Sequence, residues 1–269
     1  MGCHGMGRPI QKKADVTDWS RHSRLSGSRR DAQAHRPQAS PGYTIAAVAV
    51  LFVWNLAANL LLPDAGDFAV AASGIGLLLV IALRSGINRD QLGIGAGSIA
   101  RGIRDGLLAV IIVAAAIFVA AVVPASREVL GDDRFIGVTA WRMLWEVLVR
   151  IPLLTALGEE LAFRGVLLGL LLARYSSLRA AVLSSALFGL WHVLPGIEAL
   201  ETTTATSLTS GVMDTVSVAG QVLVTGLAGL VFAWLRLRSA SLVAPVLAHW
   251  GLNGAAYIAG WLIVQNGLA

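Results

Sequence analysis

Long runs of hydrophobic residues alternate with short polar connections over most of the 269-residue chain. Several runs approach or exceed the roughly 18–20 residues that a helix needs to cross a bilayer core about 30 Å thick. Backbone groups in lipid must be satisfied within their own segment, so each run is expected to be a helix. The pattern predicts an all-α, polytopic transmembrane helical bundle of about seven spans, with approximate limits 43–62, 68–83, 105–124, 139–173, 180–193, 217–235 and 241–265.

Three of these runs depart from the ordinary length of a span. The runs 68–83 and 180–193 are short, whereas 139–173 would extend about 52 Å at 1.5 Å per residue. We expect its first part, 139–151, to be an amphipathic helix at the membrane interface, with the crossing beginning near Pro152.

The composition agrees with a membrane protein. Hydrophobic residues make up 56% of the chain and charged residues only 14%, against about 25% charged in soluble domains. A helical bundle in lipid is therefore favoured over a soluble globular domain.

Charged residues separate onto alternate connections between the runs. Arginine and lysine are enriched in cytoplasmic loops, and this bias sets the orientation of a membrane protein. With a cytoplasmic N-terminus, the connections on its side would carry Arg84, Arg89, Arg101, Arg104, Arg174, Arg179, Arg236 and Arg238. The opposite connections would carry Asp64, Asp67, a mixed stretch from Arg127 to Arg134, then Glu198, Glu201 and Asp214. We therefore predict seven spans with the N-terminus inside, in a multi-pass protein of the bacterial plasma membrane.

The N-terminal residues 1–42 hold eight basic and three acidic side chains, which accounts for the whole net charge of +5. This segment has no apolar periodicity, so we predict a basic, disordered cytoplasmic tail that can lie along anionic lipid headgroups. Only one tryptophan, Trp19, is interleaved with the charge, and no nucleic-acid partner is expected. The transmembrane helical domain would then occupy 43–266.

Ionisable residues within the fourth run are costly to place in lipid, so they are candidates for function. Glu159 and Glu160 are adjacent there, and on a helix their side chains point about 100° apart. Glu160 and Arg164 are one turn apart and can pair on one face. Glu159 is then left for other work, and a carboxylate in an apolar pocket suits a general base.

Two further polar groups lie in later runs. Phe188 and His192 share a helix face near the end of the fifth run, and His249 and Asn253 share one in the seventh. With Glu159, these residues supply a base, two imidazoles and an amide donor, enough to hold a water and to stabilise an oxyanion.

Each group also has a structural interpretation. Glu160 and Arg164 can be a buried ion pair alone, and a single intramembrane histidine or asparagine often makes only an interhelical hydrogen bond. A proton-coupled transporter and a non-catalytic immunity or scaffold protein are the alternative functions. Loss of Glu159 distinguishes an enzyme from a scaffold, since an enzyme should lose cleavage while folding normally and a scaffold should keep its phenotype.

At these residues the sequence resembles the CPBP family of intramembrane proteases, which includes the type 2 CAAX prenyl proteases and the bacteriocin-processing, Abi-like proteins. Three family motifs occur in order: Glu159-Glu160 followed by Arg164, Phe188 followed by His192, and His249 followed by Asn253. The resemblance covers about 139–260, which would be the protease-like core.

The resemblance implies an intramembrane endopeptidase that cleaves a membrane-associated or lipid-modified peptide or protein. It implies that Glu159 and His192 activate water, that His249 and Asn253 stabilise the oxyanion, and that Glu160 and Arg164 support them. Family members are also labelled metalloproteases. The sequence lacks a His-Glu-x-x-His zinc motif, so no cofactor is firmly implied. A divalent metal such as zinc stays open, and its ligands would be Glu159, His192 and His249.

Overall fold

The computed structural model describes residues 40–61, 67–203 and 211–268. These residues belong to the second of two compact units, Ala39–Ala269. The predicted basic tail therefore lies outside the described residues, apart from 40–42.

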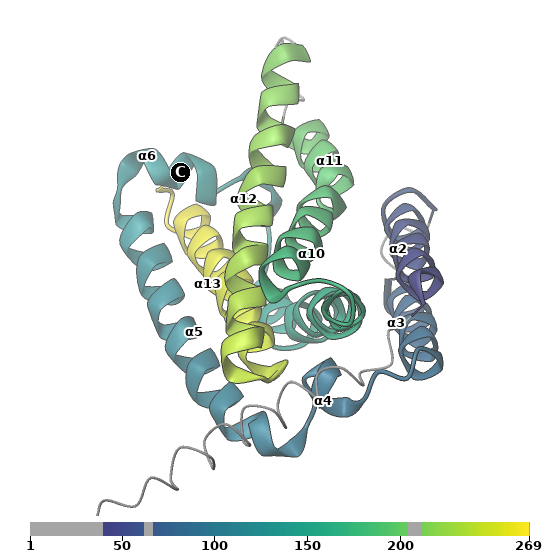
Figure 1. Cartoon of the computed structure of the whole chain (residues 1–269). Helices are drawn as coiled ribbons and strands as arrows, with labels where there is room; N and C mark the ends of the chain where they lie inside the picture. The colour runs from purple at the N-terminus through teal and green to yellow at the C-terminus, as the bar shows by residue number, and fades with distance from the viewer. Residues whose placement is uncertain (1–39, 62–66, 204–210, 269) are drawn as a thin grey trace, which may run out of the picture. The chain divides into compact units, whose positions relative to one another are not determined.

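Every secondary-structure element in the described part of the chain is helical, which confirms the predicted all-α class (Figure 1). The first elements are α2 (Pro41–Leu56), η2 (Ala57–Leu61), α3 (Asp67–Arg84), α4 (Arg89–Leu92), η3 (Ala96–Ser98), α5 (Ile99–Val122), α6 (Pro124–Leu130) and η4 (Asp133–Phe135). They are followed by α7 (Ala140–Trp145), η5 (Glu146–Leu157), α8 (Gly158–Glu160), η6 (Leu161–Leu167), α9 (Leu168–Leu172), α10 (Ser177–Trp191), α11 (Val193–Thr203), α12 (Gly211–Ser239) and α13 (Val243–Gln265).

Among the described residues, 4 helical stretches are long and apolar enough to cross a membrane: Pro41–Leu60, Arg89–Val122, Ser177–Glu198 and Thr215–Ser239. Helix α3 supplies a shorter apolar stretch. Helix α13 and the helical run from α7 to α9 carry polar candidate residues, which lower the mean hydropathy of the helices that contain them. Seven crossings therefore remain a prediction, whereas four candidate spans are observed.

The end of the fifth run differs from the one expected. The fifth run is not short, because α10 and α11 together give the 22-residue candidate span Ser177–Glu198. Pro195 lies in the first turn of α11, where the lack of an N–H costs little. Pro152 lies inside the π-helical segment η5 of a helical run from Ala140 to Leu172, and the interfacial position of 139–151 remains a prediction.

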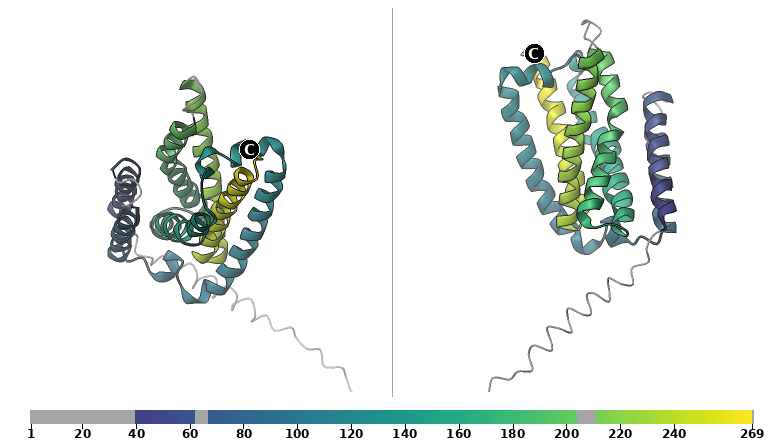
Figure 2. Two further views of the ribbon diagram at one scale, coloured as in Figure 1. Left: turned by 180° about the vertical axis from the view of Figure 1, so that it is seen from behind. Right: turned by 45° about the horizontal axis from the view of Figure 1, so that its top comes forward.

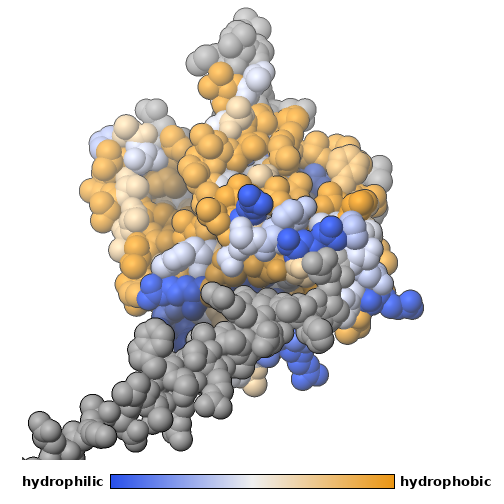
Figure 3. Space-filling model, in the orientation of Figure 1, coloured by the Kyte–Doolittle hydropathy of each residue, from blue (hydrophilic) through white to orange (hydrophobic). Residues whose placement is uncertain are grey.

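The outward faces of the long helices are apolar. Only 11% of the apolar window in Arg89–Val122 is buried, and only 17% of that in Thr215–Ser239. Hydrophobic residues cover much of the face seen in Figure 3. Exposing so large an apolar surface to water is unfavourable, so these faces are suited to contact with lipid.

Small residues let the helices that carry the candidate site approach closely. A Cβ on Gly189 of α10 would lie 2.6 Å from the carbonyl oxygen of Val222 in α12, and one on Gly251 of α13 would lie 3.1 Å from Cα of Val110 in α5. Such contacts are typical of helix packing in membranes. Figure 2 shows α5, α12 and α13 running between the same two ends of the bundle.

Candidate active site

Glu159 and Glu160 lie in the short helix α8, between the π-helical segments η5 and η6. π-helical turns are uncommon and often occur at functional sites. The two carboxylates have different surroundings, because Glu160 is fully buried whereas Glu159 is half-buried. This difference in burial agrees with the expectation from the sequence that the two carboxylates have different roles.

A hydrogen bond near Pro152 joins α13 to this helical run. In the i→i+5 pattern of η5, Pro152 would be the donor to the carbonyl of Val147, but proline has no N–H. The indole Nε1 of Trp250 donates to that carbonyl instead, at 2.7 Å. The neighbouring residue His249 is thereby held at a fixed height beside α8.

A second proline is compensated in the same way at the turn that carries His192. Pro195 would be the i+4 donor to the carbonyl of Trp191, and again no N–H exists. Nδ2 of Asn55 in α2 donates to this carbonyl at 2.9 Å. Helix α2 is therefore tied to the junction of α10 and α11.

Glu160 joins two of the predicted motifs. Its Oε1 accepts a hydrogen bond from Nη1 of Arg164 at 2.9 Å and another from Nδ1 of His249, also at 2.9 Å. The side chains of Glu160 and Arg164 are fully buried and that of His249 nearly so. A buried charge needs such partners, and the predicted ion pair between Glu160 and Arg164 is present.

Aromatic rings surround this group. The guanidinium carbon of Arg164 lies 4.0 Å from the ring centre of Phe188, with the Phe232 ring at 5.3 Å. The imidazole of His249 stacks on Phe232 at 4.9 Å and meets the edge of Phe188 at 5.9 Å. Cation–π contacts stabilise the buried guanidinium, and the stacking limits rotation of the His249 ring.

His192 contacts the same cluster through Phe188. Its Nδ1 lies 2.8 Å from the carbonyl oxygen of Phe188, and the two rings are 4.7 Å apart. A carbonyl only accepts hydrogen bonds, so Nδ1 carries the proton and Nε2 of the neutral ring is the basic nitrogen.

Glu159 lines a polar pocket of about 270 Å³. Its Oε2 is buried and receives no hydrogen bond from the described part of the chain. The pocket is bounded by Trp54, Ala58, Asn59, Ala71, Arg150, Leu154, Thr155, Glu159, Trp191, Pro195 and Glu198. A carboxylate oxygen without a protein partner in a polar pocket is available to a water or a substrate.

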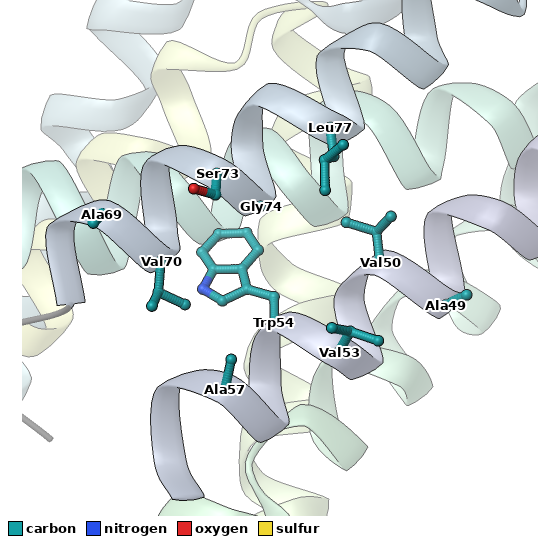
Figure 4. A pocket seen from close by; sticks show the side chains of 10 residues that line it. All are labelled: Ala49, Val50, Val53, Trp54, Ala57, Ala69, Val70, Ser73, Gly74 and Leu77. Atoms are coloured by element: carbon teal, nitrogen blue, oxygen red, sulfur yellow. The ribbon is translucent and has the colours of Figure 1, made fainter. Parts of the chain in front are cut away.

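An apolar pocket of about 560 Å³ lies between α2 and α3 and shares Trp54 with the polar pocket. Figure 4 shows the indole of Trp54 reaching from α2 toward Ser73 and Gly74 of α3. The edge of the same indole meets Trp191 at 5.3 Å. Trp54 therefore separates an apolar groove from the pocket that contains Glu159.

Residues 140–255 match the family model described as type II CAAX prenyl endopeptidase, Rce1-like. The chain carries an Rce1-like domain. No curated protein and no solved structure matches the chain. This match confirms the resemblance seen in the sequence, and together with the four apolar helices it supports a membrane protein.

The Rce1-like domain contains every candidate residue predicted from sequence. The described contacts bring Glu160, Arg164, Phe188, His192 and His249 into one cluster. Glu159 lies beside that cluster in the polar pocket, and Asn253 is half-buried one turn after His249.

The conditional metal set of Glu159, His192 and His249 does not come together as a ligand group. Within the described ranges, no three His, Cys, Asp or Glu side chains are placed to hold a metal ion. Nδ1 of His249 is bonded to Glu160, and Nδ1 of His192 to a backbone carbonyl.

The sequence interpretation missed several residues of the site. Phe232 has no signal in the sequence, because it is one apolar residue among many in α12. Asn55 and Asn59 did have a signal, since two amides one turn apart in an apolar helix are as unusual as the histidines. Both lie outside the Rce1-like domain, so the polar pocket is lined by residues of α2 and η2 as well as by residues of the domain.

Proposed function

We propose that the protein is an intramembrane endopeptidase that uses a water activated by Glu159 and His192, without a metal. Glu159 takes a proton from the water, and the resulting hydroxide attacks the scissile carbonyl carbon. The carbon–nitrogen bond then breaks, and the proton passes to the departing amine. His249 and Asn253 stabilise the oxyanion, while Glu160 and Arg164 orient His249.

The environment of Glu159 supports its role as the base. One of its oxygens is buried and has no partner among the described residues, and the pocket around it is polar enough to hold water. The tautomer of His192 leaves Nε2 as an acceptor, which suits a second contact to the same water.

The contact between Glu160 and His249 supports an oxyanion role for His249. With Nδ1 donating to Glu160, the Nε2 atom is the one left to face a substrate. An oxyanion needs a hydrogen-bond donor, so this role requires the imidazolium form of His249, whose Nε2–H can donate. Asn253 would add an amide donor one turn away.

The two pockets support our proposal for the substrate class. A polar pocket suits the scissile peptide, and the apolar groove beside it suits a transmembrane segment or a lipid chain. We propose membrane-anchored peptides or proteins as substrates and surrounding lipid as the medium. We further propose seven crossings with a cytoplasmic N-terminus, in a bacterial plasma membrane.

The hydrogen bond between His249 and Glu160 is the observation that carries this proposal. It joins two motifs whose residues are 89 positions apart, in a buried cluster beside Glu159. The test compares the N- and C-termini of membrane proteins in cells that carry the native chain or Glu159→Ala at equal levels. New termini that depend on Glu159 are expected. A phenotype that survives Glu159→Ala, with identical termini, would support the scaffold alternative instead.

A further inference from the structure

One end of the helical bundle is rich in arginine. At this end α3 leads into α5, α9 into α10, and α12 into α13. The connections there and the helix ends beside them carry eight arginines, together with the acidic residues Asp90 and Asp105. Seven of the eight arginines are exposed, whereas Arg236 is buried and donates to the carbonyls of Asp90 and Gln91.

The opposite end, where α2 and α11 end and α5 leads through α6 into α7, has a different charge balance. This end carries four arginines, Arg127, Arg134, Arg142 and Arg150, together with the acidic residues Asp67, Asp132, Asp133, Glu146 and Glu198. Arg134 pairs with Asp132 at 2.8 Å and Arg142 with Glu146 at 2.7 Å. Arg127 donates to the backbone carbonyls of Ala121 and Val122. By the bias of arginine toward the cytoplasm, this end faces the extracytoplasmic side.

The pocket of Glu159 opens toward this second end. Asn59 lies two residues before the end of η2, Ala71 lies near the start of α3, and the exposed Glu198 lies in α11. The side chain of Arg150, at the same end of the pocket, is 41% exposed. Glu159 lies at the inner end, where its Oε2 is buried. The polar lining therefore runs from Glu159 to the end of the bundle that lacks the arginine-rich connections.

We infer that water and the scissile segment of the substrate reach Glu159 from the side of the membrane opposite the arginine-rich connections, which is the extracytoplasmic side. The inference rests on the proposed function for its view of the pocket as an active site. It narrows the substrates to polypeptides whose cleaved bond lies near the extracytoplasmic end of a membrane anchor. A peptide exposed only to the cytoplasm would not reach the pocket.

The test uses cysteine accessibility, which needs no substrate. The single native cysteine is removed by Cys3→Ser, and one cysteine is placed in the pocket by Thr155→Cys or, as a second variant, Asn59→Cys. Asp133→Cys and Arg179→Cys, at exposed positions on the two ends, are the side markers. Each full-length chain is expressed in a bacterial inner membrane and treated with a membrane-impermeant maleimide in spheroplasts and in inverted vesicles.

We expect the pocket cysteines to be labelled in spheroplasts, as Asp133→Cys is, and to lose labelling in inverted vesicles, where Arg179→Cys gains it. Labelling of the pocket cysteines together with Arg179→Cys would overturn the inference. So would a lack of labelling from both sides in chains that elute as folded protein in detergent. Each of these results is independent of catalysis, so the inference can fail while the Glu159-dependent termini remain, and the reverse also holds.

Discussion

Nδ1 of His249 lies 2.9 Å from Oε1 of Glu160, although the two residues are 89 positions apart in the chain. This contact converts two sequence motifs into one site. Since the same oxygen also accepts from Arg164, the position of the imidazole depends on a buried ion pair. The stability of the fold and the geometry of the proposed oxyanion site are thus coupled at Glu160.

Removing the charge of Glu160 should test this coupling. Glu160→Gln leaves the buried guanidinium of Arg164 without its counter-charge, and breaking a buried pair in this way costs about 3–5 kcal/mol. We expect a clearly lower midpoint of thermal unfolding in detergent, together with a loss of peptide cleavage. The double variant Glu160→Gln/Arg164→Gln should recover part of the stability but none of the activity. A Glu160→Gln protein as stable as the native chain would show that the pair is not needed.

The indole of Trp250 should matter for activity beyond its effect on stability. Trp250→Phe removes the donor to the Val147 carbonyl, which Pro152 cannot replace, and we expect a loss of about 1–2 kcal/mol of unfolding free energy. Trp261→Phe is the matched control, because Trp261 makes the same kind of bond to the carbonyl of Val138. We expect the two variants to lose similar amounts of stability, and we expect only Trp250→Phe to cleave more slowly. Equal activities in the two variants would contradict a positioning role for Trp250.

Close packing of α10 on α12 should be sensitive to a single methyl group. Gly189→Ala would place its Cβ 2.6 Å from a backbone carbonyl oxygen, so the helices must separate, at a cost of about 1–3 kcal/mol. Gly220→Ala in α12 meets nothing within 4 Å and should be tolerated. Thermal unfolding and cleavage rates of the two proteins check this difference, and equal behaviour would mean that α10 and α12 can separate freely.

The sequence alone predicted much of this arrangement. Apolar periodicity predicted the helices, and the unusual cost of charge in lipid singled out Glu159, His192 and His249. The sequence could not predict that Trp250 and Asn55 donate to the carbonyls that Pro152 and Pro195 leave without a donor. Those hydrogen bonds join helices whose relative positions depend on packing. The predicted length of the fifth span was also wrong. Pro195 lies in the first turn of α11, where a proline does not end a helix, and the candidate span continues to Glu198.

Metal removal separates two mechanisms for the same residues. The described His and Glu side chains do not form a ligand group of three, and the proposed mechanism assigns the activation of water to Glu159 and His192. We therefore expect dialysis against a strong chelator to leave the cleavage rate of the purified protein unchanged. Loss of the rate on chelation, with recovery on addition of zinc, would contradict a metal-free mechanism.

The most direct test of the central claim is the rate at which purified protein in detergent cleaves a membrane-anchored peptide, compared between the native chain and Glu159→Gln. The substitution keeps the size and shape of the side chain but removes its negative charge and its capacity to take a proton. We predict a rate lower by about 100- to 10,000-fold, with an unchanged unfolding midpoint. Cleavage by folded Glu159→Gln protein at the native rate would contradict the assignment of Glu159 as the base.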